Sequence, residues 1–310
     1  MATQIDQLCE LPASAEAAPH AAWLADPTGQ FARHYNRTSF MFEHDLQRSP
    51  MFGLESLIEL SRRRPEHPDL AYWSNGRVGV ADHWDGARGP RCSLVDTIAN
   101  IDNNNSLVML KRVELDTEFG PLLNNLMERI MTFAGSVMRT DVTIGRGTIL
   151  IASPQRVTSF HIDSDVNFLF QIGGDKSISV FDQTDRTLVT DQELERYYGG
   201  DPNGAVFKAD RQADGKAYEL RAGYGVHIPC MAAHWAQNRG APSIALSINF
   251  DLRSVARVGR LYRLNGRLRR LGLAPRPPGV SAWRDGLKIA ALAGLDLARE
   301  LRRRRPAEGA

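Results

Sequence analysis

The sequence predicts an α+β protein with a mainly β core, folded as a barrel or double-sheet jelly roll and flanked by helices. Between residues 148 and 250, short runs of β-branched or aromatic residues alternate with Gly, Asp and Pro, as in short strands joined by turns. Helical spacing of apolar residues precedes this region and returns after it. The expected strands are 148–151, 166–172, 177–181, 226–228 and 243–250.

The chain is expected to form one large domain with extensions, because 310 residues suffice for a sizeable core. Pro12, Pro19 and Pro27 interrupt any long helix at the Ala-rich N-terminus. The predicted regions are 1–35, a weakly structured N-terminal segment; 36–147, helices and a strand that pack on the barrel; 148–250, the β core; and 251–310, a basic helical region.

Local patterns predict the elements around the core. Apolar residues at helical spacing predict a short helix from Leu54 that Pro65 stops, and a second helix from Pro121 that Gly135 closes. A weak alternation over 108–115 favours a strand between them. After Phe250 two helical stripes are separated by the Pro-rich stretch 275–279, and this pair is expected to cap the barrel or to pair with a second subunit.

Two features inside the core region also stand out. Gly173-Gly174-Asp175 predicts a tight turn between two strands. Residues 183–220 form a long polar interruption, which is typical of a lid or a binding segment.

Composition excludes several classes of protein. Cys9, Cys92 and Cys230 are widely spaced and form no CxxC pair, which disfavours a disulfide framework or a zinc ribbon and favours a reducing cytoplasm. The N-terminus lacks a basic region followed by an apolar run, so no secretory signal is expected. The longest apolar stretch, 289–298, is too short to span a bilayer and contains Asp296. We therefore expect a soluble protein without a membrane span.

Charge is unevenly distributed behind a net charge of +2. From residue 251 onward there are 15 Lys/Arg and 5 Asp/Glu, which leaves 23 and 31 in the rest of the chain. The arginines 302–305 could attract nucleic acid, anionic lipid or an acidic partner. Because no nucleic-acid-binding motif accompanies them, we favour a solvated helix end whose cations complement the helix dipole.

Three residues carry the candidate chemistry: His161, Asp163 and His234. On a strand, His161 and Asp163 point to one face and Ile162 to the other. Two imidazoles and one carboxylate can occupy one face of a six-coordinate Fe(II) and leave the other face open. His227 competes with His234 as the second imidazole, and its alternative role is that of a hydrogen-bonded strand residue.

The segment 153–176, together with Ile228-Pro229 shortly before His234, resembles the JmjC or cupin-like 2-oxoglutarate dioxygenases, and most closely their asparaginyl-hydroxylase-like branch. The resemblance covers about residues 105–250, and residues 30–80 resemble the N-terminal part of bacterial cupin-like proteins more weakly. It implies a double-stranded β-helix that carries Fe(II) on His161, Asp163 and His234, and a homodimer formed by the C-terminal helices. It also implies a 2-oxoglutarate pocket that is lined by Thr158, Asn167, Lys176 and Asn249.

These four residues suit a dicarboxylate. Lys176 and Thr158 can supply a cation and a hydroxyl donor to its distal carboxylate, and Asn167 and Asn249 can orient oxygens near the metal without adding charge. Members of this branch also place a tyrosine on an earlier strand, whereas the corresponding stretch 106–112 has none. Lys111, Arg112 and Tyr224 are unranked substitutes, and the candidates for the pocket rim are Arg156, Asp165, Gln171, Tyr197 and Tyr198.

The predicted function is an Fe(II)- and 2-oxoglutarate-dependent hydroxylase that acts with O₂ on an amino acid, peptide, protein or other small metabolite and releases succinate. Hydroxylation is the default because Asp163 is present, and desaturation or demethylation stays open. Two alternatives remain at this point. One is a non-catalytic ligand-sensing or regulatory cupin-like protein, and the other is a cupin metalloenzyme that does not use 2-oxoglutarate.

Overall fold

The computed structural model describes residues 23–64, 67–83 and 92–304, with side-chain surroundings up to residue 294. The predictions that concern Cys9, Pro12, Pro19, Pro65 and Arg305 fall outside these residues.

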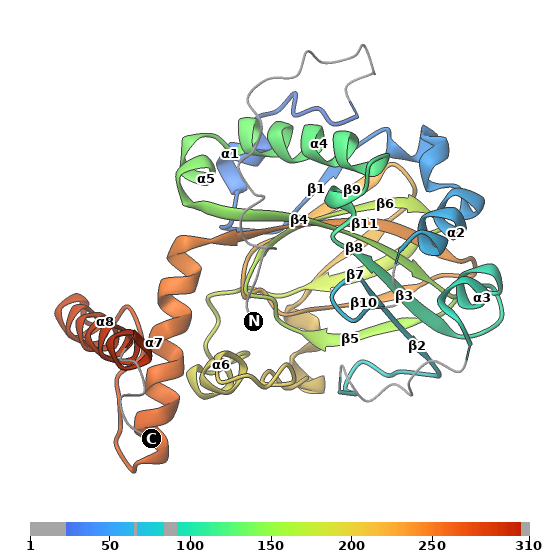
Figure 1. Ribbon diagram of the computed structural model, residues 1–310. Helices are drawn as coiled ribbons and strands as arrows, with labels where there is room; N and C mark the ends of the chain where they lie inside the picture. Colours follow the sequence, from blue (N-terminus) through green and yellow to red (C-terminus); the bar gives the residue numbers. More distant parts are fainter. Residues whose placement is uncertain (1–22, 65–66, 84–91, 305–310) are drawn as a thin grey trace, which may run out of the picture.

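Two antiparallel sheets form the core, as Figure 1 shows. The larger sheet has seven strands in the order β1-β9-β6-β11-β4-β3-β2, and the smaller has four in the order β5-β10-β7-β8. From β4 to β11 the chain alternates between the two sheets except at β7 to β8, which is the winding of a double-stranded β-helix. The strands are β1 (Phe40–Glu43), β2 (Ala71–Asn75), β3 (Ser106–Lys111), β4 (Val142–Ala152), β5 (Val157–His161), β6 (Val166–Gly173), β7 (Lys176–Val180), β8 (Lys216–Leu220), β9 (Tyr224–Ile228), β10 (His234–Asn238) and β11 (Ser243–Leu252). The predicted α+β fold with a jelly-roll core is confirmed.

Helices surround this core. The long helix α4 runs across the outer face of the large sheet, and α7 leaves the barrel at the end of β11 and carries α8 at its side (Figure 1). The helices are α1 (Gln30–His34), α2 (Leu54–Arg62), α3 (Leu94–Ala99), α4 (Phe119–Ala134), α5 (Ser136–Asp141), α6 (Asp191–Tyr198), α7 (Arg253–Arg270) and α8 (Ala282–Arg304), with short 3-10 turns at Leu46–Arg48, Pro50–Phe52, Val113–Leu115 and Ala209–Asp214. None of the described helices is long and apolar enough to cross a membrane.

Three buried clusters hold these layers together. The largest lies between α4 and the outer face of the large sheet and includes Leu123 and Phe168. The second fills the barrel between the sheets and includes Leu169 and Ile178. The third lies outside the small sheet, under the insertion that contains α6, and includes Phe160. Alternate residues of one strand thus serve different cores, as Phe168 and Leu169 do on β6.

The local predictions were right about most elements and wrong about two boundaries. Gly174 makes the predicted turn between β6 and β7 with φ +65°, and a Cβ there would lie 2.2 Å from the carbonyl oxygen of Pro242, so glycine is required. The strand predicted over 108–115 ends at Lys111, because Arg112 adopts a left-handed conformation and starts a 3-10 turn. The polar interruption predicted over 183–220 is shorter, because Lys216–Leu220 forms strand β8.

Candidate metal centre and co-substrate pocket

The structure brings His161, Asp163 and His234 together at one end of the barrel. His161 ends β5 and His234 begins β10, and the two are directly paired across these antiparallel strands. Oδ2 of Asp163 lies 3.6 Å from Nε2 of His161 and 3.7 Å from Nε2 of His234. All three potential ligand atoms lie within 4.8 Å of one another.

Hydrogen bonds fix the tautomer of both imidazoles. Nδ1 of His161 lies 2.8 Å from the carbonyl oxygen of Ser159, and Nδ1 of His234 lies 3.0 Å from that of Ala232. Because a carbonyl oxygen only accepts, each Nδ1 carries the proton and donates it. In the neutral form of each ring the lone pair is therefore on Nε2, which faces Asp163, and this is the arrangement that second-shell bonds impose on metal-binding histidines.

The charges of the three groups are linked. Burial works against ionisation of Asp163, but the neighbouring His161 and His234 outweigh it and lower its pKa to about 2. Burial and the nearby His161 lower the pKa of His234 to about 4. Burial disfavours the charged form of His161 as well, yet Asp163 raises its pKa overall. An anionic carboxylate beside a neutral His234 is thus the favoured state of the site near neutral pH.

These donors fit a divalent metal ion. Donors on one face of an octahedron with ligand distances of about 2.1 Å lie about 3 Å apart. The distances of 3.6 and 3.7 Å from Oδ2 of Asp163 to the two Nε2 atoms are close to this separation. Two imidazoles and one carboxylate suit a divalent transition metal such as Fe(II), and an octahedral ion held by three ligands would retain three open positions.

His227 belongs to a different environment. Its ring is fully buried among Phe40 and Phe168 on the outer face of the large sheet. Nε2 accepts a hydrogen bond from the backbone N–H of Asn36, and Nδ1 donates to the carbonyl oxygen of Asn167. Both ring nitrogens are occupied, so the structure places His234 and not His227 beside the other two ligands.

A β-bulge brings Thr158 to the face that carries His161. On a regular strand, residues three apart point to opposite faces. Where β5 pairs with β10, His161 is opposite His234 but Thr158 is opposite Ala236, so three steps on β5 match two on β10. Thr158 and His161 therefore both point into the barrel.

Lys176 also points into the barrel. It begins β7, and the next residues on its face, Ile178 and Val180, belong to the core between the sheets. Its side chain is buried, with 6% exposed, and burial lowers its pKa to about 8. No described residue forms an ion pair with its ammonium group. Since Val180 and not Lys176 is opposite His234, the ammonium group enters the barrel from a deeper level than the three ligands.

Asn167 and Asn249 face each other across β6 and β11 and share a chain of hydrogen bonds. Nδ2 of Asn167 donates to Oγ of Ser247, which donates to Oδ1 of Asn249, whose Nδ2 donates to Asp165. Oδ1 of Asn167 is buried without a described partner. A buried amide oxygen without a partner can accept a hydrogen bond from a polar ligand. In the flipped orientation of the side chain, the amide nitrogen could donate one instead.

Sequence reasoning missed Ser247. Ser247 joins the two asparagines, and only strand register reveals this. Met109 occupies an inward position on β3, in the stretch that has no tyrosine, and its partner on the next strand is Tyr72. Tyr72 lies on β2, a strand that the sequence pattern did not predict.

The three unranked substitutes lie in different surroundings. The ammonium group of Lys111 donates to the carbonyl oxygen of Pro68 and lies over the ring of Tyr72. Arg112 lies 3.6 Å from Glu114 in the turn after β3. Tyr224 packs against the core inside the barrel. Of the proposed rim residues, Arg156 and Gln171 are buried and donate to backbone carbonyl oxygens.

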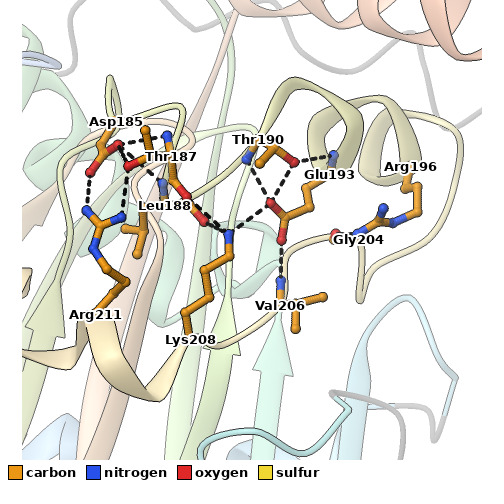
Figure 2. Close-up of polar contacts among 10 residues, drawn as sticks. All are labelled: Asp185, Thr187, Leu188, Thr190, Glu193, Arg196, Gly204, Val206, Lys208 and Arg211. Carbon is orange, nitrogen blue, oxygen red and sulfur yellow. Dashed lines mark hydrogen bonds and ion pairs between the residues drawn. The ribbon is translucent and has the colours of Figure 1, made fainter.

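Internal hydrogen bonds and ion pairs hold the insertion between β7 and β8 together, as Figure 2 shows. Thr190 and Glu193 form a capping box at the start of α6. The buried Glu193 carboxylate also accepts from the backbone N–H of Val206 and from the ammonium group of Lys208. Arg211 pairs with Asp185 in the same network. The insertion therefore has a defined structure beside the barrel mouth.

Comparison with known proteins agrees with this architecture. No family model and no curated protein matches the chain. The X-ray structure of Escherichia coli YcfD matches over 92% of this chain and 69% of that chain, with 16% identity and a TM-score of 0.50. A structure of the E. coli ribosomal oxygenase YcfD with cobalt and 2-oxoglutarate matches over 88% and 67%, with 15% identity and a TM-score of 0.49. A Bacillus subtilis oxalate decarboxylase matches over 34% and 22%, with 15% identity and a TM-score of 0.24.

The chain thus shares the fold of YcfD. This confirms the fold that the sequence resemblance implied, an antiparallel jelly roll with added helices.

Proposed function

We propose that this protein is an Fe(II)- and 2-oxoglutarate-dependent oxygenase. The observation that supports it most is the combination of two Nε2 lone pairs and a carboxylate at the barrel mouth with an unpaired ammonium group deeper in the same barrel. A metal site alone needs no buried lysine, and a lysine alone needs no metal ligands. Together they match a ligand that has a chelating end and an anionic end.

Each residue has a defined task in this proposal. His161, Asp163 and His234 would hold the metal, and Lys176 with Thr158 would bind the distal carboxylate of 2-oxoglutarate. Along β7 the backbone of Lys176 lies about 13 Å from the level of His234, a distance that a lysine side chain and a five-carbon diacid can span together. Asn167, Ser247 and Asn249 would orient oxygens between these ends. When bound, Fe(II) and 2-oxoglutarate supply the oxidising chemistry with O₂, and succinate and CO₂ are released.

Two other functions remain as alternatives. A non-catalytic ligand sensor would use the pocket and need no metal, and the close approach of three ligand atoms speaks against it. A metalloenzyme that does not use 2-oxoglutarate would leave Lys176 without a role, although its burial is costly.

Uncoupled turnover distinguishes the three. The purified chain with Fe(II), 2-oxoglutarate and O₂ should release succinate, and His161→Ala should stop this. Lys176→Met should need a much higher 2-oxoglutarate concentration. Metal binding without succinate would favour the second alternative, and absence of both would favour the first.

The reaction on the substrate is proposed to be hydroxylation of an amino acid, peptide, protein or other small metabolite. The name of YcfD, a ribosomal oxygenase, makes ribosomal proteins a sensible part of the substrate panel. The readout is the stimulation of succinate release together with a mass increase of one oxygen atom in the substrate.

We also propose a reducing compartment such as the cytoplasm, in line with the free Cys92 and Cys230.

A homodimer through the C-terminal helices is proposed as well. Large apolar side chains are exposed there, including Leu273 at 55%, Trp283 at 65% and Leu287 at 61%. Leu273→Glu should convert a dimer to a monomer of 34.5 kDa in sedimentation. Leu115→Glu is the matched control, because Leu115 is also 55% exposed but lies after β3. A wild-type chain that sediments as a monomer would contradict the dimer.

A further inference from the structure

The peptide bond that follows Asp163 is held from both sides. Asp163 lies beyond the end of β5, so no strand pairing fixes it. Its carbonyl oxygen accepts a hydrogen bond of 2.7 Å from the backbone N–H of Met231. The backbone N–H of the next residue, Ser164, donates to the hydroxyl oxygen of Tyr197 at 3.1 Å. These two bonds set the plane of the peptide that carries the candidate carboxylate ligand.

Met231 is itself held in a strained conformation. Its φ is +61°, in the left-handed region, which costs an unbranched L-residue about 1 kcal/mol or more. Its sulfur accepts a hydrogen bond of 3.2 Å from the hydroxyl group of Tyr198. Met231 precedes His234 on the segment that leads into β10. Of the last two residues of α6, Tyr197 therefore contacts the backbone next to Asp163, and Tyr198 contacts the side chain of Met231, three residues before His234.

Helix α7 in turn fixes the end of α6. The ring of Tyr198 stacks on that of Tyr262, with an interplanar angle of 2° and centroids 5.8 Å apart. Arg269 forms a two-point ion pair with the buried Glu195. The approach of the helices depends on Gly259, since a Cβ there would lie 2.4 Å from the ring of Tyr198.

We propose that Tyr197 is a positioning residue for Asp163, and that α7 acts on the metal centre through Tyr198. This inference rests on the metal site of the proposed function. The hydroxyl group of Tyr197 orients the peptide after Asp163, while Tyr198 supports Met231 and through it the carbonyl group of Asp163. Helix α7 thereby contributes to metal affinity without touching a ligand.

Metal affinity measures this role without turnover. Co(II) binding to the full-length chain is followed by calorimetry, together with thermal unfolding of each variant. Tyr197→Phe keeps the ring and removes the hydroxyl group, and it should weaken Co(II) binding about tenfold, the lower end of the usual effect of an outer-shell partner. Tyr262→Phe is the control, because it loses a hydrogen bond to Asp191 in the same cluster but keeps the ring that stacks on Tyr198. It should bind Co(II) as the wild type does.

A second pair of variants tests the contribution of α7. Gly259→Ala should displace Tyr198 and weaken Co(II) binding several-fold. Gly266→Ala lies on the same helix, and its Cβ would be 3.4 Å from Glu195, an ordinary contact, so it should leave binding unchanged. If Tyr197→Phe and Gly259→Ala only lower the unfolding temperature and keep wild-type affinity, the positioning role is overturned while the metal site stands. If the wild type binds no Co(II), the metal site itself fails and the inference fails with it.

Discussion

Lys176 places an ammonium group inside the barrel at a cost to stability. Burial lowers its pKa from 10.5 to about 8, so below pH 8 the folded chain carries a charge that the unfolded chain holds more cheaply. Lys176→Met should therefore raise the free energy of unfolding by about 2 kcal/mol at pH 7, measured in urea, while it weakens 2-oxoglutarate binding. The exposed Lys216→Met serves as the control and should change neither. Loss of stability in Lys176→Met would mean that the lysine serves folding.

The same residue predicts a pH dependence of co-substrate binding. The population of the ammonium form falls as pH rises through about 8, so the affinity for 2-oxoglutarate should fall above that pH. Lys176→Arg, which stays charged, should bind with no loss between pH 7 and 9. A wild-type affinity that is flat over this range would contradict the assigned contact.

Single residues show which parts of the candidate site could be predicted from the sequence. His161 and Asp163 could be proposed from the spacing of the motif, whereas Lys176 could be proposed only from the resemblance. Thr158 could be placed only by the resemblance, since its odd spacing from His161 contradicts a regular strand and works because of the bulge. Ser247 was missed because its place beside Asn167 depends on pairing between the distant strands β6 and β11, which local patterns do not encode.

At the scale of elements, α6 depends on one buried acid. Glu193 accepts from Thr190, Val206 and Lys208, and these donors lower its pKa although burial opposes this. Glu193→Gln removes the charge and turns an amide N–H₂ toward donors, so it should lower the free energy of unfolding by about 2 kcal/mol. Glu55→Gln, in the first turn of α2 but exposed, is the matched control and should stay within about 0.5 kcal/mol of the wild type. If both variants change the free energy of unfolding by the same small amount, the hydrogen bonds of Glu193 contribute little to stability.

Elements were predicted where their periodicity is strong and local. Helix α4 follows from an apolar face, and Pro121 falls in its first turn. Strands β1 and β2 were not predicted, because both are short and gain their stability from pairing with β9 and β3. The insertion was expected to be a long loop, yet distant bonds such as those of Glu193 and Arg269 give it a helix.

At the scale of the whole molecule, buried neutral histidines predict acid sensitivity. Burial lowers the pKa of His44 to about 4 and that of His227 to about 3. The unfolded chain takes up protons at these groups near pH 6.5, so the folded state should lose stability as pH falls from about 6.5 toward 4, by about 1.4 kcal/mol per pH unit for each histidine. His44→Gln should reduce this slope, and the exposed His67→Gln should not. Urea unfolding at pH 7, 6 and 5 measures it, and a stability that is constant over this range would be the contrary result.

The whole fold places the candidate metal ligands, the lysine and the α6 insertion around one barrel, and the function proposed for that barrel can be tested directly. Under anaerobic conditions, Fe(II) and 2-oxoglutarate should together produce a weak visible charge-transfer band that neither gives alone. Asp163→Ala should abolish the band, and Lys176→Met should move it to higher 2-oxoglutarate concentration. A wild-type chain that shows no band at saturating Fe(II) and 2-oxoglutarate would contradict the account.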